Sequence, residues 1–398
     1  MTVASDVPLP VLGARLREAR RARGMSQADA AAGIGVSRPT LISVEQGKRV
    51  PTAAELVDFA RLYGRDVHEL VRDTPPVEAL TARFRAVEQG SRDTKAAVDE
   101  LQRLADDVHE LELSEGLTIQ RRWPDEYDVA GLSSAAAATL AADEERKRLG
   151  LGDGPLLNLR QVLESDVGLR VFSLPMPSAV AGLFAVVEPV GGCIGINSRH
   201  PFERQRWTLA HEYGHFLLHR YSAEVTSVVP GRSRDEQTAE AFAAAFLMPK
   251  DGLIRRFQQA RRQRGGTVTA VDVLQLGAAY EVSAQAMALR LEDLELLAGG
   301  WWDSLVQRGL KVQEARDTLG IAIQSRDEDT VPKRAQYLAV EAFLEGRLSE
   351  GRLARLLRLD RVAARDVVHR LAGSQDVAHE GETQRWLWEP EPETQASD

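Results

Sequence analysis

The hydrophobic positions of this chain recur with a helical period at both ends and with a shorter period over a central stretch. Over residues 8–72 apolar residues recur every three or four positions, which predicts a compact set of short helices. Helix-start signals accompany this pattern. Ser26 precedes an alanine-rich run, Ser37 stands two residues before a proline, and Thr52 stands three residues before Glu55.

A second helical pattern covers residues 77–113 and is interrupted at Gly90. Its apolar residues form a seam with spacings of four, three, four and three: Ala97, Leu101, Leu104, Val108 and Leu111. Such a seam is the contact surface of a coiled coil when it continues for several heptads. This one covers about two heptads, which favours a helix packed on its own domain over a dimer contact.

Short runs with strand character follow at residues 169–172, 180–187 and 193–196, separated by proline and glycine. Helical patterns flank them at residues 133–149, from about residue 201, and at residues 233–247. Everything after residue 250 is helical in pattern, with a polar tail from about residue 373. The sequence therefore predicts a mostly α protein with a small central α+β domain.

The composition is that of a globular chain: of 398 residues, 43% are hydrophobic and 27% are charged. The net charge of −9 is uneven, because residues 1–72 carry 11 Lys/Arg and 8 Asp/Glu, a balance of +3. The single cysteine, Cys193, excludes an intramolecular disulfide and fits a reducing compartment. Without a signal-peptide pattern or a long apolar run, we expect a cytoplasmic protein with no membrane partner.

The strongest chemical signal is the run His211-Glu212-Tyr213-Gly214-His215 within a predicted helix. Residues four apart lie on one face of a helix, so both imidazoles can address the same metal ion. The glutamate after the first histidine can take a proton from metal-bound water and return it to a leaving amine. The pattern predicts a zinc site, and Gly214 leaves room for another backbone to approach.

A catalytic zinc ion needs a third protein ligand and one open position. Glu236 and Glu240 lie four residues apart on the next predicted helix, so one can bind the metal while the other orients a histidine ring. Two histidines and a carboxylate suit zinc best, although Mn²⁺ and Fe²⁺ occupy similar sites. A structural helix with two chance histidines is the competing interpretation.

This part of the chain resembles the ImmA/IrrE family of zincin-like metallopeptidases over roughly residues 135–297. The resemblance rests on Arg206-Trp207-Thr208-Leu209-Ala210-His211-Glu212-Tyr213-Gly214-His215-Phe216-Leu217-Leu218-His219, Ile194-Gly195-Ile196-Asn197, Glu236, Ala239, Phe242-Ala243 and Leu247-Met248-Pro249. It implies one zinc ion per chain bound by His211, His215 and Glu236, with Glu212 as the general base. The family usually has Asn or Asp where this chain has Glu240, which leaves a supporting role for Glu240 open.

Two further residues near this run need separate interpretations. His219 lies about 12 Å along the helix from His211, too far to share its metal, so we expect a structural or supporting histidine. Cys193 in its strand is interpreted as a small buried hydrophobic residue. The alternative is an inhibitory ligand whose thiolate occupies the open zinc position.

Residues 12–70 resemble the Cro/repressor-like helix-turn-helix family. The resemblance rests on Leu16-Arg17-Glu18-Ala19-Arg20, Gly24-Met25-Ser26-Gln27, Gly35-Val36-Ser37-Arg38-Pro39-Thr40, Ile42-Ser43-Val44-Glu45-Gln46-Gly47-Lys48-Arg49-Val50-Pro51, Thr52 and Leu56. It implies that the helix at residues 37–46 enters the major groove of double-stranded DNA. We expect DNA contacts from Gln27, Arg38, Thr40, Ser43, Lys48 and Arg49. A helix-turn-helix used only for protein contact is the alternative, and such domains usually act as homodimers.

Together the two resemblances predict a lambda-repressor-like helix-turn-helix followed by a zincin-like peptidase with a short mixed sheet and a helical C-terminal region. The expected segments are a DNA-binding domain at 8–72, a helical linker with possible dimerisation at 73–130, a peptidase core at 131–250, its helical extension at 251–298, a C-terminal helical domain at 299–373 and an acidic tail at 374–398. The expected function is a DNA-binding regulator whose zinc endopeptidase cleaves a repressor or antitoxin, or itself at Thr74-Pro75-Pro76, after a stress signal. The alternative is an antitoxin-like repressor whose zinc domain is a sensor or scaffold without turnover.

Overall fold

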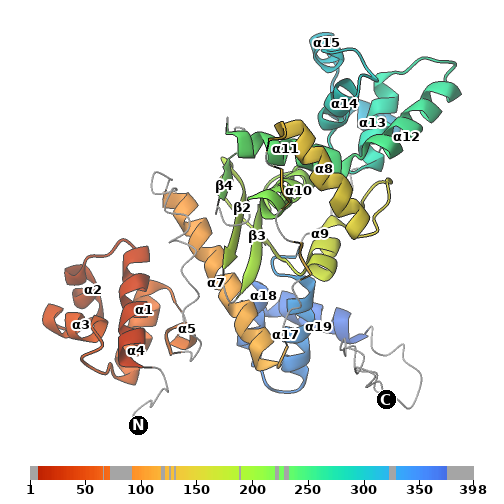
Figure 1. The fold of residues 1–398 in the computed structure, drawn as a ribbon. Helices are drawn as coiled ribbons and strands as arrows, with labels where there is room; N and C mark the ends of the chain where they lie inside the picture. Colours follow the sequence, from red (N-terminus) through yellow and green to blue (C-terminus); the bar gives the residue numbers. More distant parts are fainter. Residues whose placement is uncertain are drawn as a thin grey trace, which may run out of the picture.

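The computed structural model describes residues 8–65, 67–71, 92–117, 122–124, 127–129, 131–187, 190–219, 224–227, 233–321 and 329–373. Its described part is mostly helical and contains one small mixed sheet, which confirms the predicted fold class. The proposed cleavage point at residues 74–76 and the acidic tail lie outside the described residues. Figure 1 shows the N-terminal helices in red and orange, the sheet in green and the last helices in blue.

The N-terminal helices form a compact module with its own core. The polar residues expected to start helices do so, since Ser26, Ser37 and Thr52 each accept a hydrogen bond from the backbone N–H three residues on. Leu16 and Leu41 are fully buried in this core. The elements are α1 (Leu9–Ala22), α2 (Gln27–Ile34), α3 (Arg38–Glu45), α4 (Ala53–Tyr63) and α5 (Val67–Val71).

The central sheet has four strands in the order β1-β3-β2-β4. The strands are β1 (Arg170–Leu174), β2 (Val180–Val187), β3 (Gly191–Asn197) and β4 (Glu224–Ser227). β1 runs parallel to β3, while β2 runs antiparallel to both β3 and β4. The first three strands were predicted, and the short edge strand β4 was not.

Helices α8 (Ser134–Arg148), α10 (Phe202–Leu218) and α11 (Arg234–Leu247) build the larger core with one face of the sheet. Side chains of β3 alternate between the two faces of the sheet. Ile194 and Ile196 belong to the core of α10, whereas Cys193 belongs to the core on the opposite face. The sheet therefore separates α10 from the surroundings of Cys193.

Helix α7 (Arg92–Ser114) covers that opposite face together with the last helices of the chain. The predicted seam of α7 is buried here, with Leu101 and Leu104 fully inaccessible. Its neighbours are β1, α17 (Lys333–Leu344) and α18 (Glu350–Leu357), and α19 (Arg361–Gly373) completes the core. The seam thus packs within its own chain, as the favoured interpretation expected.

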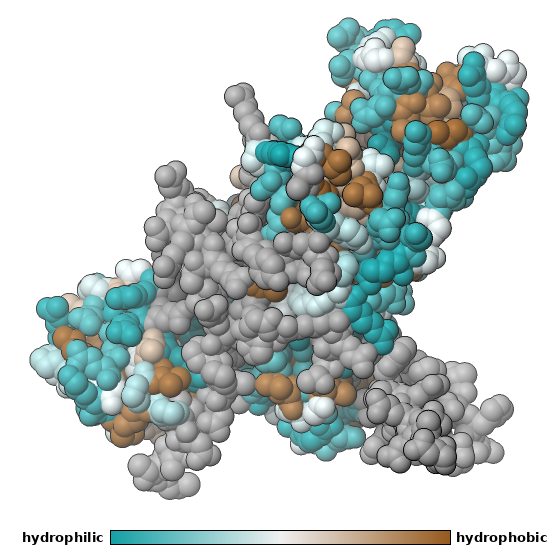
Figure 2. Space-filling view, in the orientation of Figure 1, coloured by the Kyte–Doolittle hydropathy of each residue, from teal (hydrophilic) through white to brown (hydrophobic). Residues whose placement is uncertain are grey.

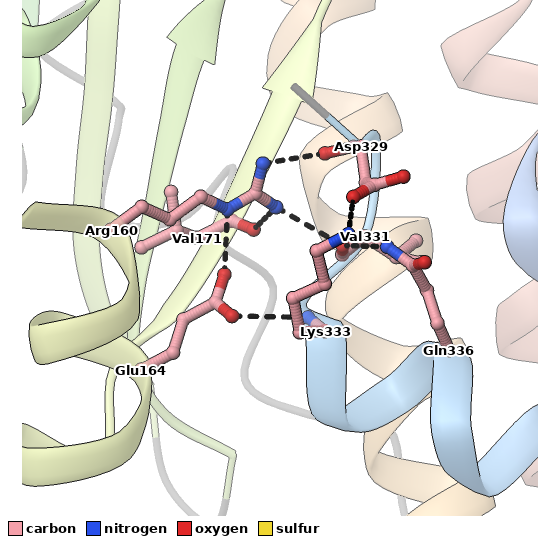
Figure 3. Close-up of polar contacts among 7 residues, drawn as sticks. All are labelled: Arg160, Glu164, Val171, Asp329, Val331, Lys333 and Gln336. Atoms are coloured by element: carbon pink, nitrogen blue, oxygen red, sulfur yellow. Dashed lines mark hydrogen bonds and ion pairs between the residues drawn. The ribbon is translucent and has the colours of Figure 1, made fainter. Parts of the chain in front are cut away.

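Arg160 joins the last helices to the rest of the molecule (Figure 3). It follows the start of α9 (Leu159–Val162), and its guanidinium donates hydrogen bonds to the backbone carbonyls of Val171, Asp329 and Val331 at 2.7–3.0 Å. Its Nε also donates to Glu164 at 2.7 Å. A single arginine therefore connects β1 to the segment that leads into α17.

The remaining helices extend the core of α10 rather than that of α7. They are α12 (Lys250–Gln263), α13 (Ala270–Ala279), α14 (Ala284–Asp293), α15 (Trp301–Gln307) and α16 (Val312–Leu319). Trp302 is buried in the core of α10, while Val331 and Leu338 lie in the core of α7. The hydrophobic cores therefore divide residues 299–373 between two units, whereas the sequence suggested one C-terminal domain.

The visible surface is mostly hydrophilic over α12–α15 and over the N-terminal module, with small separate hydrophobic patches (Figure 2). Within the described ranges, none of the helices combines the length and the apolar character that a bilayer crossing requires.

Candidate functional sites

Helices α10 and α11 cross closely because Gly214 has no side chain. A Cβ at Gly214 would lie 2.9 Å from Cδ1 of Phe242 and 3.3 Å from Cα of Ala239 on α11. Those distances are shorter than ordinary carbon contacts, so a larger residue would push the two helices apart. This close approach brings the first turn of α11, capped by Ser233, to the His211–His215 face of α10.

Three side chains meet at this crossing: His211 and His215 from α10 and Glu236 from α11. The two Nε2 atoms of the histidines lie 3.1 Å apart. The Glu236 carboxylate lies 3.5 Å from Nε2 of His211 and 3.4 Å from Nε2 of His215. The structure thus brings together the three residues that the sequence suggested as metal ligands.

The geometry of the three donor atoms fits a tetrahedral metal ion. Ligand atoms ~2.0–2.1 Å from a tetrahedral zinc ion lie about 3.3 Å from one another. The two imidazole nitrogens are 3.1 Å apart, and each lies 3.4–3.5 Å from one of the two oxygens of Glu236, close to that value. All donor atoms lie within 4.8 Å of one another, and both histidines are buried.

The protonation of the cluster follows from its burial and its carboxylates. Burial lowers the pKa of His211, but hydrogen bonds to Glu236 and Glu240 outweigh this effect and raise it to about 10. The same contacts with His211 and His215 hold the pKa of Glu236 well below its usual range. The carboxylates thus favour the protonated form of His211, and metal binding would be coupled to release of a proton.

Glu240 lies one turn further along α11 and orients His211 from its other side. The Nδ1 of His211 lies 3.2 Å from one Glu240 oxygen, and the indole N–H of Trp207 donates to the other oxygen at 3.0 Å. The Glu240 side chain is half exposed. The hydrogen bond from Trp207 therefore restrains the solvent-exposed carboxylate of Glu240. The sequence alone did not suggest this contact.

Glu212 is fully buried between the two histidines along α10. The role of general base that the sequence suggested for Glu212 stays a prediction. The placement of Glu212 depends on strand β2, which passes directly over α10.

A buried carboxylate beneath α10 was not predicted. Glu145 of α8 is inaccessible to solvent and accepts hydrogen bonds from the hydroxyls of Tyr213 and Tyr127 and from the guanidinium of Arg148. This network anchors α10 at Tyr213, between Glu212 and Gly214. Its signal in the sequence is weak, because Glu145 differs from exposed glutamates only by lying on the alanine face of α8.

His219 and Cys193 do not join the cluster. His219 follows the end of α10, and its Nε2 lies 3.3 Å from a carboxylate oxygen of Asp235. Cys193 faces α7 on the other side of the sheet, and burial raises the pKa of its thiol to about 12. The alternation of β3 explains why the suggested inhibitory contact is not made, and the placement agrees with a small buried hydrophobic residue.

In the N-terminal module, the residues suggested for DNA contact differ in how freely they face solvent. Arg38 and Lys48 are exposed, while Thr40, Ser43 and Arg49 are partly buried. Arg49 forms an ion pair with Glu55 at 2.9 Å. Their roles in DNA contact stay predictions.

Gln27 is held by a buried ion pair that joins the helices of the module. Arg20 of α1 contacts Glu45 at the end of α3 at 2.6 Å, and Gln27 of α2 donates to the same carboxylate at 3.1 Å. This network links α1, α2 and α3 through the carboxylate of Glu45. It gives Gln27 a structural contact beside the suggested contact with DNA.

The fold and the cluster define a class of protein, a helix-turn-helix module joined to a metallopeptidase-like domain. Comparison with known families agrees: residues 11–72 match a helix-turn-helix domain, and residues 164–292 match the peptidase M78 family, described as an IrrE N-terminal-like domain. The chain therefore contains a helix-turn-helix domain followed by an IrrE N-terminal-like domain.

Among curated proteins, the chain is similar to the cryptic phage CTXphi transcriptional repressor RstR of Vibrio cholerae. The two are 31% identical over 80 residues, which cover 20% of this chain and 72% of the repressor. No solved structure matches the chain. The similarity to the repressor covers too little of this chain to include the IrrE-like domain.

Proposed function

We propose that this protein is a DNA-binding transcription regulator with a zinc-dependent endopeptidase that cleaves a repressor or antitoxin-type protein after a stress signal. One observation carries the proposal. Two imidazoles and a carboxylate converge beside a buried glutamate, in a chain that also contains a complete helix-turn-helix module. A DNA-binding module gives no advantage to bulk protein degradation, so we favour a regulatory substrate.

In this proposal His211, His215 and Glu236 hold one zinc ion, and Glu240 fixes the ring of His211. A bound zinc ion would polarise a peptide carbonyl and lower the pKa of a water molecule at its open position. Glu212 lies beside the ligands on α10, where its carboxylate can accept a proton and later donate it to the leaving amine. Burial of Glu212 keeps this proton transfer away from bulk water.

For the N-terminal module, we propose that α3 enters the major groove of an operator and that Arg38, Thr40 and Ser43 reach base edges. Lys48 would contact phosphate, and Arg49 would do so if its pair with Glu55 opens. Gln27, restrained by Glu45, would present its amide from the start of α2. The similarity to a transcriptional repressor supports this role, and a homodimer on a two-fold operator is the expected arrangement.

The direct test is cleavage by the purified protein. The zinc-loaded chain, with and without DNA, is incubated alone and with regulators encoded beside it, and the products are identified by intact mass spectrometry. The proposal expects a defined cut in one of these proteins that a chelator prevents. No cut in any of them would favour the alternative, an antitoxin-like repressor whose metal domain is a sensor or scaffold without turnover.

Glu240 offers a test of how the cluster is organised. Because its carboxylate orients His211, Glu240→Ala is expected to weaken zinc affinity about 10–100-fold. Glu240→Gln should weaken zinc affinity less, since the amide oxygen can still accept the Nδ1–H of His211. Competition with a zinc chelator measures both variants, and equal affinity of Glu240→Ala and the wild type would remove Glu240 from the site.

Lys48 offers a test of the DNA surface. Lys48→Ala should weaken binding to DNA duplexes of different sequence by a similar factor and reduce the slope of log affinity against log salt by about one. Fluorescence anisotropy at several salt concentrations measures both quantities. Lys311→Ala is the matched control, because that exposed lysine precedes α16 outside the helix-turn-helix module. An unchanged salt slope for Lys48→Ala would exclude a phosphate contact.

A further inference from the structure

Strand β2 comes closest to the metal helix at Gly182. This residue pairs with Ile196 of β3 on one side and Thr226 of β4 on the other, so it lies inside the sheet rather than at its edge. A Cβ at Gly182 would lie 2.3 Å from Oε1 of Glu212 and 2.6 Å from Cγ2 of Thr208. Both neighbours lie on α10, one helical turn apart.

The backbone does not explain the glycine. Gly182 is not among the glycines with a positive φ, so an L-residue can adopt its conformation. The pairing of β2 with β4 shifts between Val180 and Gly182, but an irregularity without a positive φ does not require glycine. Residue 182 is restricted by space instead, because the Glu212 carboxylate lies where its Cβ would be.

We propose that Gly182 is a positioning residue for the reaction, which it serves by leaving room for the Glu212 carboxylate under β2. The inference rests on the proposed role of Glu212 as the proton acceptor. The backbone of β2 forms one wall around this carboxylate, and α10 forms the other. Glu212 can therefore remain beside His211 and His215 only while residue 182 has no side chain.

The steric clash of an alanine at position 182 would be relieved most easily at its nearest contact, the Glu212 carboxylate. The clashing atom of Glu212 is the end of a flexible side chain, whereas Thr208 is a short, branched residue held on the helix. Rotation of the carboxylate would relieve the contact with Glu212, whereas the 2.6 Å contact with Thr208 would require a small shift of that side chain or of β2. The histidines and Glu236 would keep their places, so metal binding and proton transfer would respond differently to the substitution.

The matched control is Gly195 of the neighbouring strand β3. A Cβ there would meet Cε of Met176 at 3.1 Å and Cδ1 of Leu101 at 3.5 Å, on the face of the sheet that α7 covers. Gly195→Ala therefore adds the same methyl group to the same sheet without approaching α10. It should retain the metal site and the cleavage rate of the wild type.

The first measurement is a double-mutant cycle on thermal unfolding, which does not depend on a substrate. Gly182→Ala should lower the Tm of the wild type, and it should lower the Tm less in the Glu212→Asp and Glu212→Ala backgrounds, where the carboxylate is drawn back or absent. The same Tm loss in all three backgrounds would overturn the inference, because Gly182 would then act through another contact.

The second measurement separates metal binding from catalysis. Gly182→Ala loaded with Co²⁺ should keep the visible absorption spectrum of the wild type, since the three ligands stay in place. Its cleavage rate should fall by at least about tenfold, toward that of a variant without its general base. A wild-type cleavage rate in Gly182→Ala would overturn the inference.

Failure of the inference about Gly182 can be distinguished from failure of the proposed endopeptidase function. If the zinc-loaded wild type cleaves nothing, the endopeptidase proposal fails and the catalytic meaning of Gly182 fails with it. The Tm cycle would still report whether Gly182 makes room for Glu212. If the wild type cleaves but the cycle shows no coupling, only the inference about Gly182 is lost.

Discussion

Substitution of His215 by alanine is expected to reduce bound zinc from about one ion per chain to almost none. His215 is fully buried, and its Nε2 lies within 3.4 Å of both other donor groups of the cluster. Without it, His211 and Glu236 could supply only two ligands, fewer than the three that catalytic zinc sites use. Elemental analysis of wild type and His215→Ala, purified side by side, measures this loss.

The control for this substitution is His219, which directly follows the end of α10. His219 contacts Asp235 and stands outside the cluster, so His219→Ala should retain the metal. Because the N-terminal module has a separate core, His215→Ala should also still bind DNA, and an unchanged circular dichroism spectrum shows that the rest of the chain is folded as well. Stoichiometric zinc in His215→Ala, or none in a folded wild type, would contradict the proposed site.

Local signals in the sequence were sufficient for the elements whose residues are close together along the chain. The helix starts at Ser26, Ser37 and Thr52 follow from side-chain capping, which involves neighbours only three residues apart. The pair His211 and His215 follows from helical spacing in the same way. Helical spacing also made Glu236 and Glu240 candidates for the third ligand, and the family resemblance chose Glu236.

Features that depend on distant parts of the chain were not predictable from such signals. The seam of α7 gave its own helix, yet nothing in it indicates that its partners are α17 and α18, more than 200 residues later. The only sequence signal for the burial of Glu145 is its place on the alanine face of α8, and Gly182 does not differ in sequence from other glycines in strands. The edge strand β4 is only four residues long, too short for a period to be recognised.

Substitution of Glu212 by glutamine is expected to slow cleavage strongly while leaving zinc binding intact. Glutamine has nearly the same shape, so it fits the fully buried position under β2, but its amide cannot accept a proton from water at neutral pH. General acid–base catalysis contributes about 10²–10⁴-fold to a rate, and the loss should fall in that range. The rate of appearance of the cut product, followed by mass spectrometry, measures it.

The matched control makes the same acid-to-amide change at Asp235, which precedes Glu236 on α11 but does not belong to the metal cluster. Asp235→Asn alters a half-exposed carboxylate that contacts His219, and it should cleave at the wild-type rate. This pair of variants also decides between the two proposed functions in the cell. If Glu212→Gln binds zinc and DNA and still regulates its target genes as the wild type does, the metal domain acts as a sensor or scaffold. If regulation is lost while zinc and DNA binding persist, proton transfer by Glu212 is part of the function, and the chain acts as a peptidase.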